Sequence, residues 1–185
     1  MTALVRACDA IGLSVVRVDR VAVHGGSIRL YLRHGAGGHA SEASDLAEAE
    51  RLAGLTTLDP WTAFADRVRA HRTTLVDLLE RLAADGRRLA GYGAPAKGNT
   101  LLNYCGVDTR LIPYTVDKNP MKVGLYTPGA HLPVRPVSTL VDPATAPHYV
   151  LLLAWNFADE IMRQQAGFRR QGGAFIVPIP EPRVV

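Results

Sequence analysis

Hydrophobic and polar positions at the start of the chain predict one helix and two strands. Apolar residues recur at helical spacing up to Gly12, a residue that commonly ends a helix. From residue 13 to 34 apolar and polar residues alternate, as in two half-buried strands joined by a turn at residues 24–26. The alternating apolar positions are Val16, Val18, Val21, Val23, Ile28, Leu30 and Leu32. A helix and one hairpin bury little on their own, so we expect residues 1–35 to be the end of a larger domain.

The pattern between residues 36 and 86 predicts a helical connector. Ser41 is suited to cap a short helix over residues 42–53. Asp59 as N-cap and Pro60 in the first helical position begin a second, longer helix, which ends before Gly86. Its apolar stripe consists of Trp61, Phe64, Val68, Leu75, Leu78, Leu79 and Leu82. We interpret this amphipathic helix as a connecting or packing helix.

After residue 87 short apolar runs alternate with helical segments. Strands are predicted at 87–93, 110–117, 147–156 and 173–180, and helices at 97–106 and 157–172. This alternation is typical of an α/β fold with a doubly wound, mostly parallel, Rossmann-like sheet. A long proline- and glycine-rich stretch lies between Asp117 and Pro147. Loops of this length inside a compact domain are usually functional or disordered.

Composition excludes several classes of protein. The chain has 185 residues, of which 48% are hydrophobic, so we expect a globular protein. No apolar run is long enough to span a membrane, and the N-terminus lacks the pattern of a signal peptide. Cys8 and Cys105 lie far apart without metal-ligand spacing, so we expect reduced thiols in a cytoplasmic protein. The net charge of +4 comes without a basic tract, which argues against nucleic-acid binding.

The lysines are concentrated in one part of the chain. Arginine is used almost everywhere that a basic residue occurs, and the only lysines are Lys97, Lys118 and Lys122. A compact, rotatable ammonium differs in its chemistry from an arginine fork. The cluster therefore indicates a site that binds an anion.

A glycine-rich turn precedes the first of these lysines in the stretch GYGAPAKGN, residues 91–99. Gly91, Gly93 and Ala96 fit the relaxed dinucleotide fingerprint G-x-G-x-x-[GA], and Asp117 follows where the ribose-binding acid would fall. Lys97 would begin the next helix and face the same anion. The lysine is followed by glycine, so this is no Walker loop. A tight strand-to-helix turn that binds no ligand is the alternative interpretation.

Two further segments carry polar or aromatic residues near predicted strand ends. Trp155 and Asn156 follow an apolar strand, where the indole could stack on a ring and the amide could bind a ligand or simply cap the next helix. Tyr126 and His131 lie in the long loop, which is either a plain turn or a lid. His24 is a weak catalytic candidate, because a lone histidine is more often structural. The chain has no Ser-His-Asp spacing, paired-cysteine metal motif, HExxH motif or methyl-donor glycine loop.

Four longer segments together resemble one family: VAVHGGSIRLYLRHG, GYGAPAKGNTLLNYCG, YTVDKNPMKVGLYTPGAHLPV and VLLLAWNFADEI. They look like the C-terminal half of S-adenosylmethionine-dependent C-methyltransferases that act on nucleotide-linked deoxysugars. The resemblance implies three parts in a complete enzyme: a zinc-binding module, a methyltransferase domain and a Rossmann-like C-terminal domain that helps to hold the substrate. Residues 1–35 would then end the methyltransferase domain, residues 36–86 would connect, and residues 87–185 would form the Rossmann-like domain.

The chain departs from that family because the zinc module, the methyl-donor loop and the expected Glu-His segment are absent. We therefore expect a C-terminal portion of a C-methyltransferase whose S-adenosylmethionine site and zinc site lie outside it, and which partners a missing N-terminal catalytic part. Its own task would be to hold a nucleotide-linked sugar or similar small molecule. The substrate-binding candidates are Gly91, Gly93, Ala94, Lys97, Gly98, Asn99, Asp117, Asn119, Lys122, Tyr126, His131, Trp155 and Asn156. An NAD(P)-binding Rossmann domain of an oxidoreductase and a ligand-free interaction module remain the alternatives.

Overall fold

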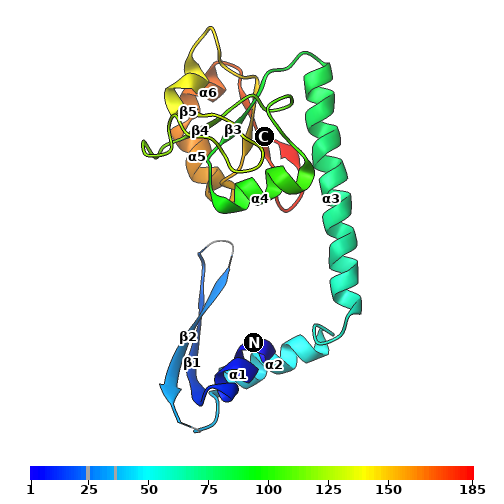
Figure 1. Ribbon diagram of the computed structural model, residues 1–185, viewed down its shortest axis with the longest axis vertical. Coiled ribbons are helices and arrows are strands. Elements are labelled where there is room, and N and C mark those ends of the chain that lie inside the picture. The colour runs from blue at the N-terminus through cyan, green and yellow to red at the C-terminus, as the bar shows by residue number, and fades with distance from the viewer. Residues whose placement is uncertain (24–25, 36) are drawn as a thin grey trace. The chain divides into compact units, whose positions relative to one another are not determined.

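The computed structural model describes residues 1–23, 26–35 and 37–185. Its contacts divide the chain into two compact units, Met1–Arg67 and Val68–Val185. Figure 1 shows the elements of both units, coloured along the chain. The division falls inside the long helix α3, Asp59–Ala84, whose first residues therefore belong to one unit and whose remainder belongs to the other.

The first unit consists of a hairpin and two short helices around a small core. It contains α1 (Thr2–Ala10), β1 (Leu13–Val21), β2 (Ser27–His34) and α2 (Ser41–Leu52). The two strands are antiparallel, from Leu13 opposite His34 to Val21 opposite Ser27. The core holds four buried residues, Met1, Cys8, Val15 and Ala43. The helix and strand pair predicted for this region is confirmed.

Two details of the first unit differ from the sequence prediction. A bulge between Val15 and Arg17 interrupts the alternation, so that Val15 is buried while Val16 is 40% exposed. Ser41 is the first residue of α2, and Ala40 occupies the N-cap position without a side-chain hydrogen bond. Of the predicted turn at 24–26, residues 24 and 25 lie outside the described part of the chain.

The helix α3 begins at Asp59, so that Asp59 is its first residue and not its N-cap. It ends before Gly86 as predicted, and Gly86 adopts a positive φ of 73° that favours glycine. Within the second unit, the fully buried Leu75 and Leu79 of this helix pack into the core. The C-terminal part of the amphipathic stripe therefore covers the sheet of that unit, whereas Trp61 and Phe64, which belong to the first unit, are 53% and 51% exposed.

The second unit is a six-stranded sheet with the order β5-β4-β3-β6-β7-β8. Its strands are β3 (Leu89–Tyr92), β4 (Thr115–Asp117), β5 (Val134–Pro136), β6 (Tyr149–Leu152), β7 (Ala174–Val177) and β8 (Arg183–Val184). Only β8 runs antiparallel to its neighbour. The chain winds outward from β3 to β5 and then returns to β6 beside β3. The predicted doubly wound, mostly parallel sheet is confirmed.

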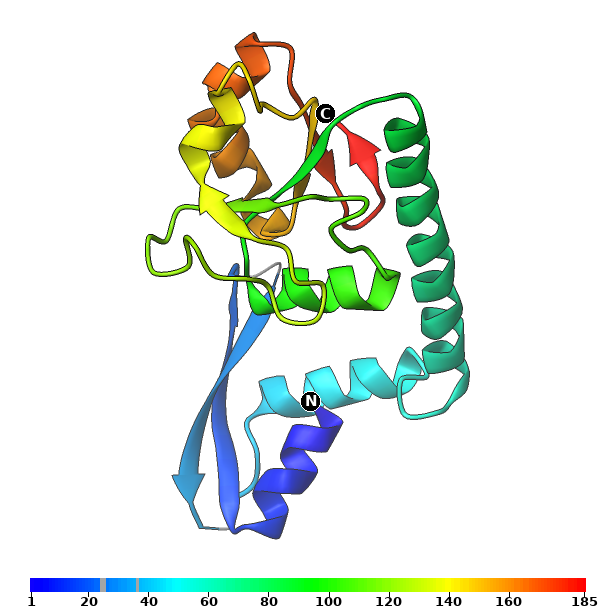
Figure 2. The same cartoon turned by 45° about the horizontal axis from the view of Figure 1, so that its top comes forward.

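Helices cover both faces of this sheet (Figure 2). On one face, α3 and α4 (Ala96–Cys105) enclose a core that includes Leu102 and Leu151. On the other face, α5 (Ala158–Gln164), α6 (Ala166–Arg170) and the 3-10 turn η1 (Val137–Val141) enclose a core that includes Phe168 and Phe175. A parallel sheet has to be buried in this way because its strands are apolar on both sides.

Some boundaries in the second unit were predicted wrongly. Of residues 110–117 only Thr115–Asp117 form a strand. The predicted helix over 157–172 is split at Gln165 into α5 and α6 and is preceded by the 3-10 turn η2 (Trp155–Phe157). The strands β5 and β8 were not predicted, because three and two residues carry too little periodicity to be recognised.

Candidate functional site

Three chain segments meet at the carboxyl edge of the sheet, where β3, β4 and β6 end. Gly93 follows β3 with a φ of 92°, Asp117 ends β4, and Trp155 begins the 3-10 turn after β6. The strand order reverses between β3 and β6. In open α/β sheets such a reversal leaves a crevice between the diverging connections, and ligands bind there.

Two of the predicted substrate-binding glycines are explained by close packing. A Cβ on Gly91 would lie 2.8 Å from Thr115 Oγ1, and one on Gly98 would lie 2.6 Å from Leu153 Cβ. The N–H of Gly91 donates to the carbonyl of Tyr114 at 2.9 Å. These glycines therefore let β3 and α4 approach their neighbours, which places the turn between them.

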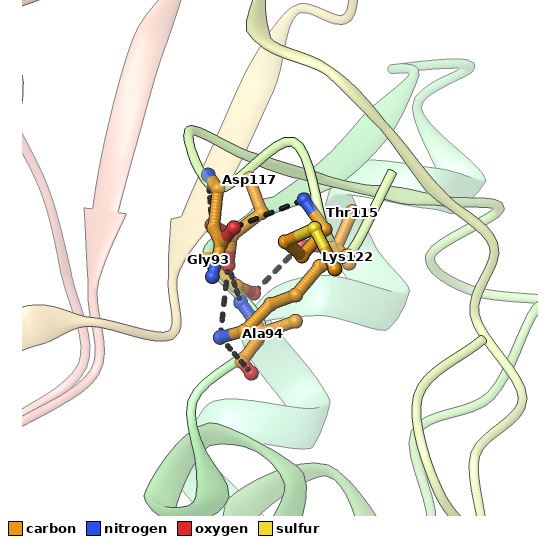
Figure 3. A network of polar contacts seen from close by, with 7 residues as sticks. Gly93, Ala94, Thr115, Asp117 and Lys122 are labelled. Atoms are coloured by element: carbon orange, nitrogen blue, oxygen red, sulfur yellow. Dashed lines mark hydrogen bonds and ion pairs between the residues drawn. The ribbon is translucent and has the colours of Figure 1, made fainter. Parts of the chain in front are cut away.

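The turn itself has its backbone groups satisfied from within (Figure 3). The N–H of Gly93 donates to Val116 O at 2.6 Å, and Thr115 Oγ1 donates to Gly93 O at 2.9 Å. The N–H of Ala94 donates to Asp117 Oδ2 at 2.7 Å, and Lys122 Nζ donates to Ala94 O at 2.9 Å. All four polar backbone groups of Gly93 and Ala94 thus have partners in the protein.

Asp117 and Lys122 form the centre of this network. Besides Ala94, the Asp117 carboxylate accepts the N–H of Asn119 at 2.8 Å through Oδ1, and Lys122 Nζ lies 3.5 Å from its Oδ2. Asn119 in turn accepts the N–H of Met121 at 3.0 Å. The structure brings Ala94, Asp117, Asn119 and Lys122 together as the sequence predicted, but their contacts are with one another. We call Ala94, Asp117 and Lys122 the brace.

Lys97 belongs to a separate cluster on the same edge. It lies in the first turn of α4, donates from Nζ to Asn156 Oδ1, and places its ammonium 4.6 Å from the centre of the Trp155 ring. Both of these partners are neutral, so within the described part of the chain they leave its charge uncompensated. Partial burial lowers the pKa of the Lys97 ammonium below its ordinary value. Asn156 lies within η2 and does not cap α5, whose N-cap is Phe157.

The start of α4 adds hydrogen-bond donors beside this ammonium. The first N–H groups of a helix have no partner inside it, and those of Ala96 and Lys97 are in this position. Pro95, the N-cap residue, supplies no side-chain hydrogen bond. Asn99 donates its N–H to Pro95 O at 3.1 Å, while its buried Oδ1 has no hydrogen-bond partner within the described chain. Free N–H donors and an ammonium together suit an anion.

A cavity of about 300 Å³ opens beside the turn, between the ends of β3 and β4 and the helix α5. Its walls are Tyr92, Gly93, Pro95, Asp117, Lys118, Lys122, Ala154, Phe157, Glu160, Ile161 and Gln164. Neither Lys97 nor the Trp155 and Asn156 pair belongs to these walls. Pro95, which precedes α4, is one of these walls and joins the cavity to the segment that carries Lys97.

Several cavity residues were missing from the sequence-based candidates. Lys118 Nζ donates to Gln164 Oε1 at 2.8 Å, and Gln164 Nε2 donates to Glu160 Oε1 at 2.7 Å. Burial is the main cause that raises the pKa of Tyr92, whose hydroxyl lies 3.3 Å from Gln165 Nε2. The spacing of Glu160 and Gln164, four residues apart on the helix after β6, was the available signal. Lys118 was visible only as a member of the lysine cluster.

Tyr126 and His131 lie outside these two clusters and do not line the cavity. Tyr126 is 66% exposed, and His131 is exposed with a φ of 54°. Their loop is fixed to α4 by Asn103, whose Nδ2 donates to Asn99 O at 2.8 Å and to Pro128 O at 3.0 Å. Their predicted contact with a ligand stays a prediction.

Other expectations concern catalysis, metals and membranes. His24, the weak catalytic candidate, lies outside the described residues. Over residues 1–23, 26–35 and 37–185 no group of three or more His, Cys, Asp or Glu side chains is placed to hold a metal ion. Within the same ranges, every helix is too short or too polar to cross a membrane.

Comparison with known proteins gives two matches. Residues 22–180 match the family model described as the C-methyltransferase C-terminal domain. The C-methyltransferase NovU of Streptomyces niveus is 41% identical over 177 residues, which cover 94% of this chain and 41% of that protein. The chain therefore spans about two fifths of the length of this relative.

Proposed function

The chain belongs to the C-methyltransferase C-terminal domain family, and from this premise we propose that it holds the substrate of a C-methyltransferase. The substrate we propose is a nucleotide-linked deoxysugar or a related small molecule that carries a diphosphate. The observation that carries the proposal is the uncompensated Lys97 ammonium beside the first N–H groups of α4.

Phosphate is the anion that this cluster suits best. Helix N-termini bind phosphates because free N–H groups and the helix dipole both favour negative charge. Lys97 adds a full positive charge, held ready by the neutral Asn156 amide and the Trp155 ring. An arriving phosphate oxygen can replace Asn156 as its hydrogen-bond acceptor.

The adjoining cavity is the proposed place for another part of the same ligand. Its volume of about 300 Å³ is at the lower end of the range of small-molecule sites. Tyr92, Phe157 and Ile161 give it apolar and aromatic walls, and Lys118 with Gln164 provides polar contacts at its side. A ring system beside the diphosphate fits this combination of surfaces.

The methyl donor S-adenosylmethionine is the cofactor that the relative's activity implies for a complete enzyme. Its reactive sulfonium centre is positively charged, whereas the edge described here carries Lys97, Lys118 and Lys122. These residues do not fit the donor. We therefore propose that S-adenosylmethionine, which supplies the methyl group, and any zinc bind in a part of the enzyme outside this chain, and that residues 1–35 end its methyltransferase domain.

The second candidate function is a dinucleotide-binding domain. The strand order and the positions of Gly91, Gly93 and Ala96 favour it, because both are features of NAD(P)-binding folds. The engagement of Asp117 disfavours it, because both of its carboxylate oxygens already accept N–H groups of its own protein. The third alternative, a ligand-free interaction module, predicts that neither nucleotide binds.

Calorimetric titration of the full chain with deoxythymidine diphosphate, thymidine and NAD tests the proposal. We expect the diphosphate to bind more tightly than the nucleoside and than NAD. Lys97→Gln should weaken diphosphate binding about ten-fold, since a charge-assisted hydrogen bond contributes roughly 1.5 kcal/mol or more. Arg110→Gln, which removes one positive charge from the turn after α4, is the matched control and should change little. Equal affinity for diphosphate and nucleoside, or an unchanged Lys97→Gln variant, would contradict the proposal.

A further inference from the structure

We propose that Asp117 and Lys122 are positioning residues of the diphosphate site: they hold the turn before α4 in place and do not contact the phosphate themselves. The inference rests on the proposed function, because it concerns how the start of α4 is presented to the phosphate. It also assigns these two residues a different task from the direct substrate contacts that the sequence indicated.

The polar atoms of the brace are engaged with one another. Asp117 accepts the N–H of Ala94 through Oδ2 at 2.7 Å and the N–H of Asn119 through Oδ1 at 2.8 Å. Lys122 donates to Ala94 O at 2.9 Å and lies 3.5 Å from the same carboxylate. A phosphate that reached Ala94 would find its N–H already bonded. The site for the anion is therefore displaced to the first N–H groups of α4 and to Lys97.

The brace needs a carboxylate and not merely a polar side chain. Asp117 accepts one N–H on each of its two oxygens, whereas an asparagine offers one acceptor and one donor group. In an Asp117→Asn variant, one of the two backbone N–H groups would face the amide NH₂ and lose its partner. The Asp117 side chain is only 13% exposed, so little water is available to replace the lost bond.

Lys122 closes the other side of the turn. Its ammonium is the only side-chain donor to Ala94 O among the described hydrogen bonds, and it balances the charge of Asp117. Its contacts connect the turn at residues 93–95 to the loop after β4. The turn after β3 and the loop after β4 lie at the same edge of the sheet and are thereby fixed to each other. The helix α4 therefore starts from a defined position.

The brace also sets ligand preference. In dinucleotide-binding folds an acid at the end of the second strand accepts hydrogen bonds from the ribose hydroxyls. Here the acid in that place is turned toward the protein's own backbone (Figure 3). A ligand that needs this ribose contact would have to break the brace, whereas a diphosphate bound at Lys97 would not.

The direction in which Asp117→Asn changes diphosphate affinity distinguishes a residue that positions the turn from one that merely lies near the phosphate. If Asp117 merely lay near the bound phosphate, Asp117→Asn would remove a repelling charge and tighten diphosphate binding. If Asp117 holds the turn, the same substitution should weaken binding by roughly five-fold or more, because a buried N–H loses its acceptor. Lys122→Gln should also weaken diphosphate binding, because the turn before α4 loses the hydrogen bond from the Lys122 ammonium.

The experiment is titration of the full chain with deoxythymidine diphosphate at several salt concentrations. A lysine that contacts phosphate contributes strongly to the salt dependence of affinity, whereas a lysine that is paired with a carboxylate and makes no phosphate contact contributes less. Lys122→Gln should therefore lower affinity with a smaller change in the salt slope than Lys97→Gln, which should lower both. The double variant Asp117→Asn/Lys122→Gln should be little weaker than the worse single variant, since one brace is removed in all three.

Matched controls come from a second turn of the same kind. Asp108 accepts the N–H of Arg110 at 2.9 Å and pairs with its guanidinium at 2.9 Å, so it repeats the acid, the turn and the basic partner after the other end of α4. Asp108→Asn and Arg110→Gln should leave diphosphate affinity unchanged. A loss of affinity in these controls equal to that of Asp117→Asn would show a general effect of turn disruption and overturn the proposal.

Hydrogen exchange tests the brace without any ligand. In Asp117→Asn and Lys122→Gln the amides of residues 93–99 should exchange faster than in the parent chain, and in Asp108→Asn they should not. Unchanged exchange, or tighter diphosphate binding by Asp117→Asn, overturns the brace. If Lys97→Gln weakens binding and the brace variants do not, the brace alone fails. If the parent chain binds no diphosphate, the proposed function fails, and the exchange result still decides on the brace.

Discussion

The hairpin of the first unit and the strands β3 and β6 of the second bury very different shares of their residues. β1 and β2 have nine and eight residues, of which only Ser14 and Val15 are buried. β3 and β6 have four residues each, and all but Tyr149 are buried. Strand length is thus unrelated to burial here. What differs is the covering layer, because helices pack on both faces of the second sheet.

The second unit therefore has large cores on both faces of its sheet, whereas the core of the first unit is small. Leu32 of the hairpin is 46% exposed, and Ile28 and Val16 are each 40% exposed. At roughly 25 cal/mol per Å² of apolar surface buried, these side chains contribute far less to folding than Leu151 or Phe175, which are at most 1% exposed. The second unit therefore supplies most of the stability of the chain and carries the candidate site.

The largest expected effect concerns methyl transfer. If residues 1–35 end a methyltransferase domain, as we propose, the purified chain has no donor site of its own and should transfer no methyl group. Incubation with labelled S-adenosylmethionine and keto-sugar nucleotides measures this directly. A complete C-methyltransferase treated in parallel is the positive control. Robust turnover by this chain would show that the first unit and the site form a working enzyme by themselves.

Hydrogen exchange of the two hairpin strands should differ from that of β6 by orders of magnitude. Few buried contacts hold β1 and β2, so local opening should expose their amides at a small free-energy cost. The amides of Val150 and Leu151 should exchange only on opening of the buried sheet. Exchange followed by mass spectrometry resolves both segments. Equal protection would mean that the hairpin is covered by something beyond its own four-residue core.

The two units also differ in how far their sequence revealed them. The parallel sheet was predictable because its strands are continuous apolar runs, and its glycine turn and lysines could be placed at one edge from strand ends alone. The bulge at Val16 was not, because Val15 and Val16 are both apolar and their sequence does not show which of them faces the core. The break of the helix at Gln165 was likewise hidden, because both halves are good helical sequence.

At the candidate site, sequence predicted residues that the structure brings to one edge of the sheet, and it did not predict the contacts that they make with one another. Lys97 lies with Trp155 and Asn156, and Asp117 lies with Lys122, but the two groups are separate clusters. A motif gives the residue types at a strand end and does not say whether a carboxylate faces a ligand or its own backbone. Gln164 and Phe157 were missed because they reach the cavity from α5 and from the 3-10 turn before it, whose orientation only packing determines.

Replacing one glycine of each unit by alanine tests whether tight packing is confined to the second unit. Gly98→Ala would place a Cβ 2.6 Å from Leu153 Cβ, so we expect a loss of about 1–2 kcal/mol in unfolding free energy despite better helix propensity. It should also shift α4 and weaken diphosphate binding. Gly12→Ala meets open space and is opposed only by its φ of 69°, a strain of roughly 1–2 kcal/mol confined to the hairpin. Chemical denaturation and titration separate the two effects, and unchanged diphosphate affinity in Gly98→Ala would contradict the packing argument.

The smallest expected effect is a loss of stability of the second unit at acid pH, which depends on the protonation of His148. Desolvation is the main cause that lowers the pKa of His148, and Arg88 and Arg87 lower it further. Its Nδ1 accepts the N–H of Arg88 at 2.8 Å, a bond that only the unprotonated nitrogen can make. Because the folded pKa lies below the unfolded one, the unfolded chain takes up its proton first as the solution is acidified. The contribution of His148 to stability is therefore present above about pH 6.5, the ordinary histidine pKa, and is lost as the pH falls through the lower folded value.

His148→Asn keeps an acceptor for the Arg88 N–H and removes the titration. Denaturation of both proteins between pH 7 and about pH 5 should show a slightly shallower loss of stability in the variant, and identical pH profiles would mean that His148 keeps its proton equilibrium unchanged on folding.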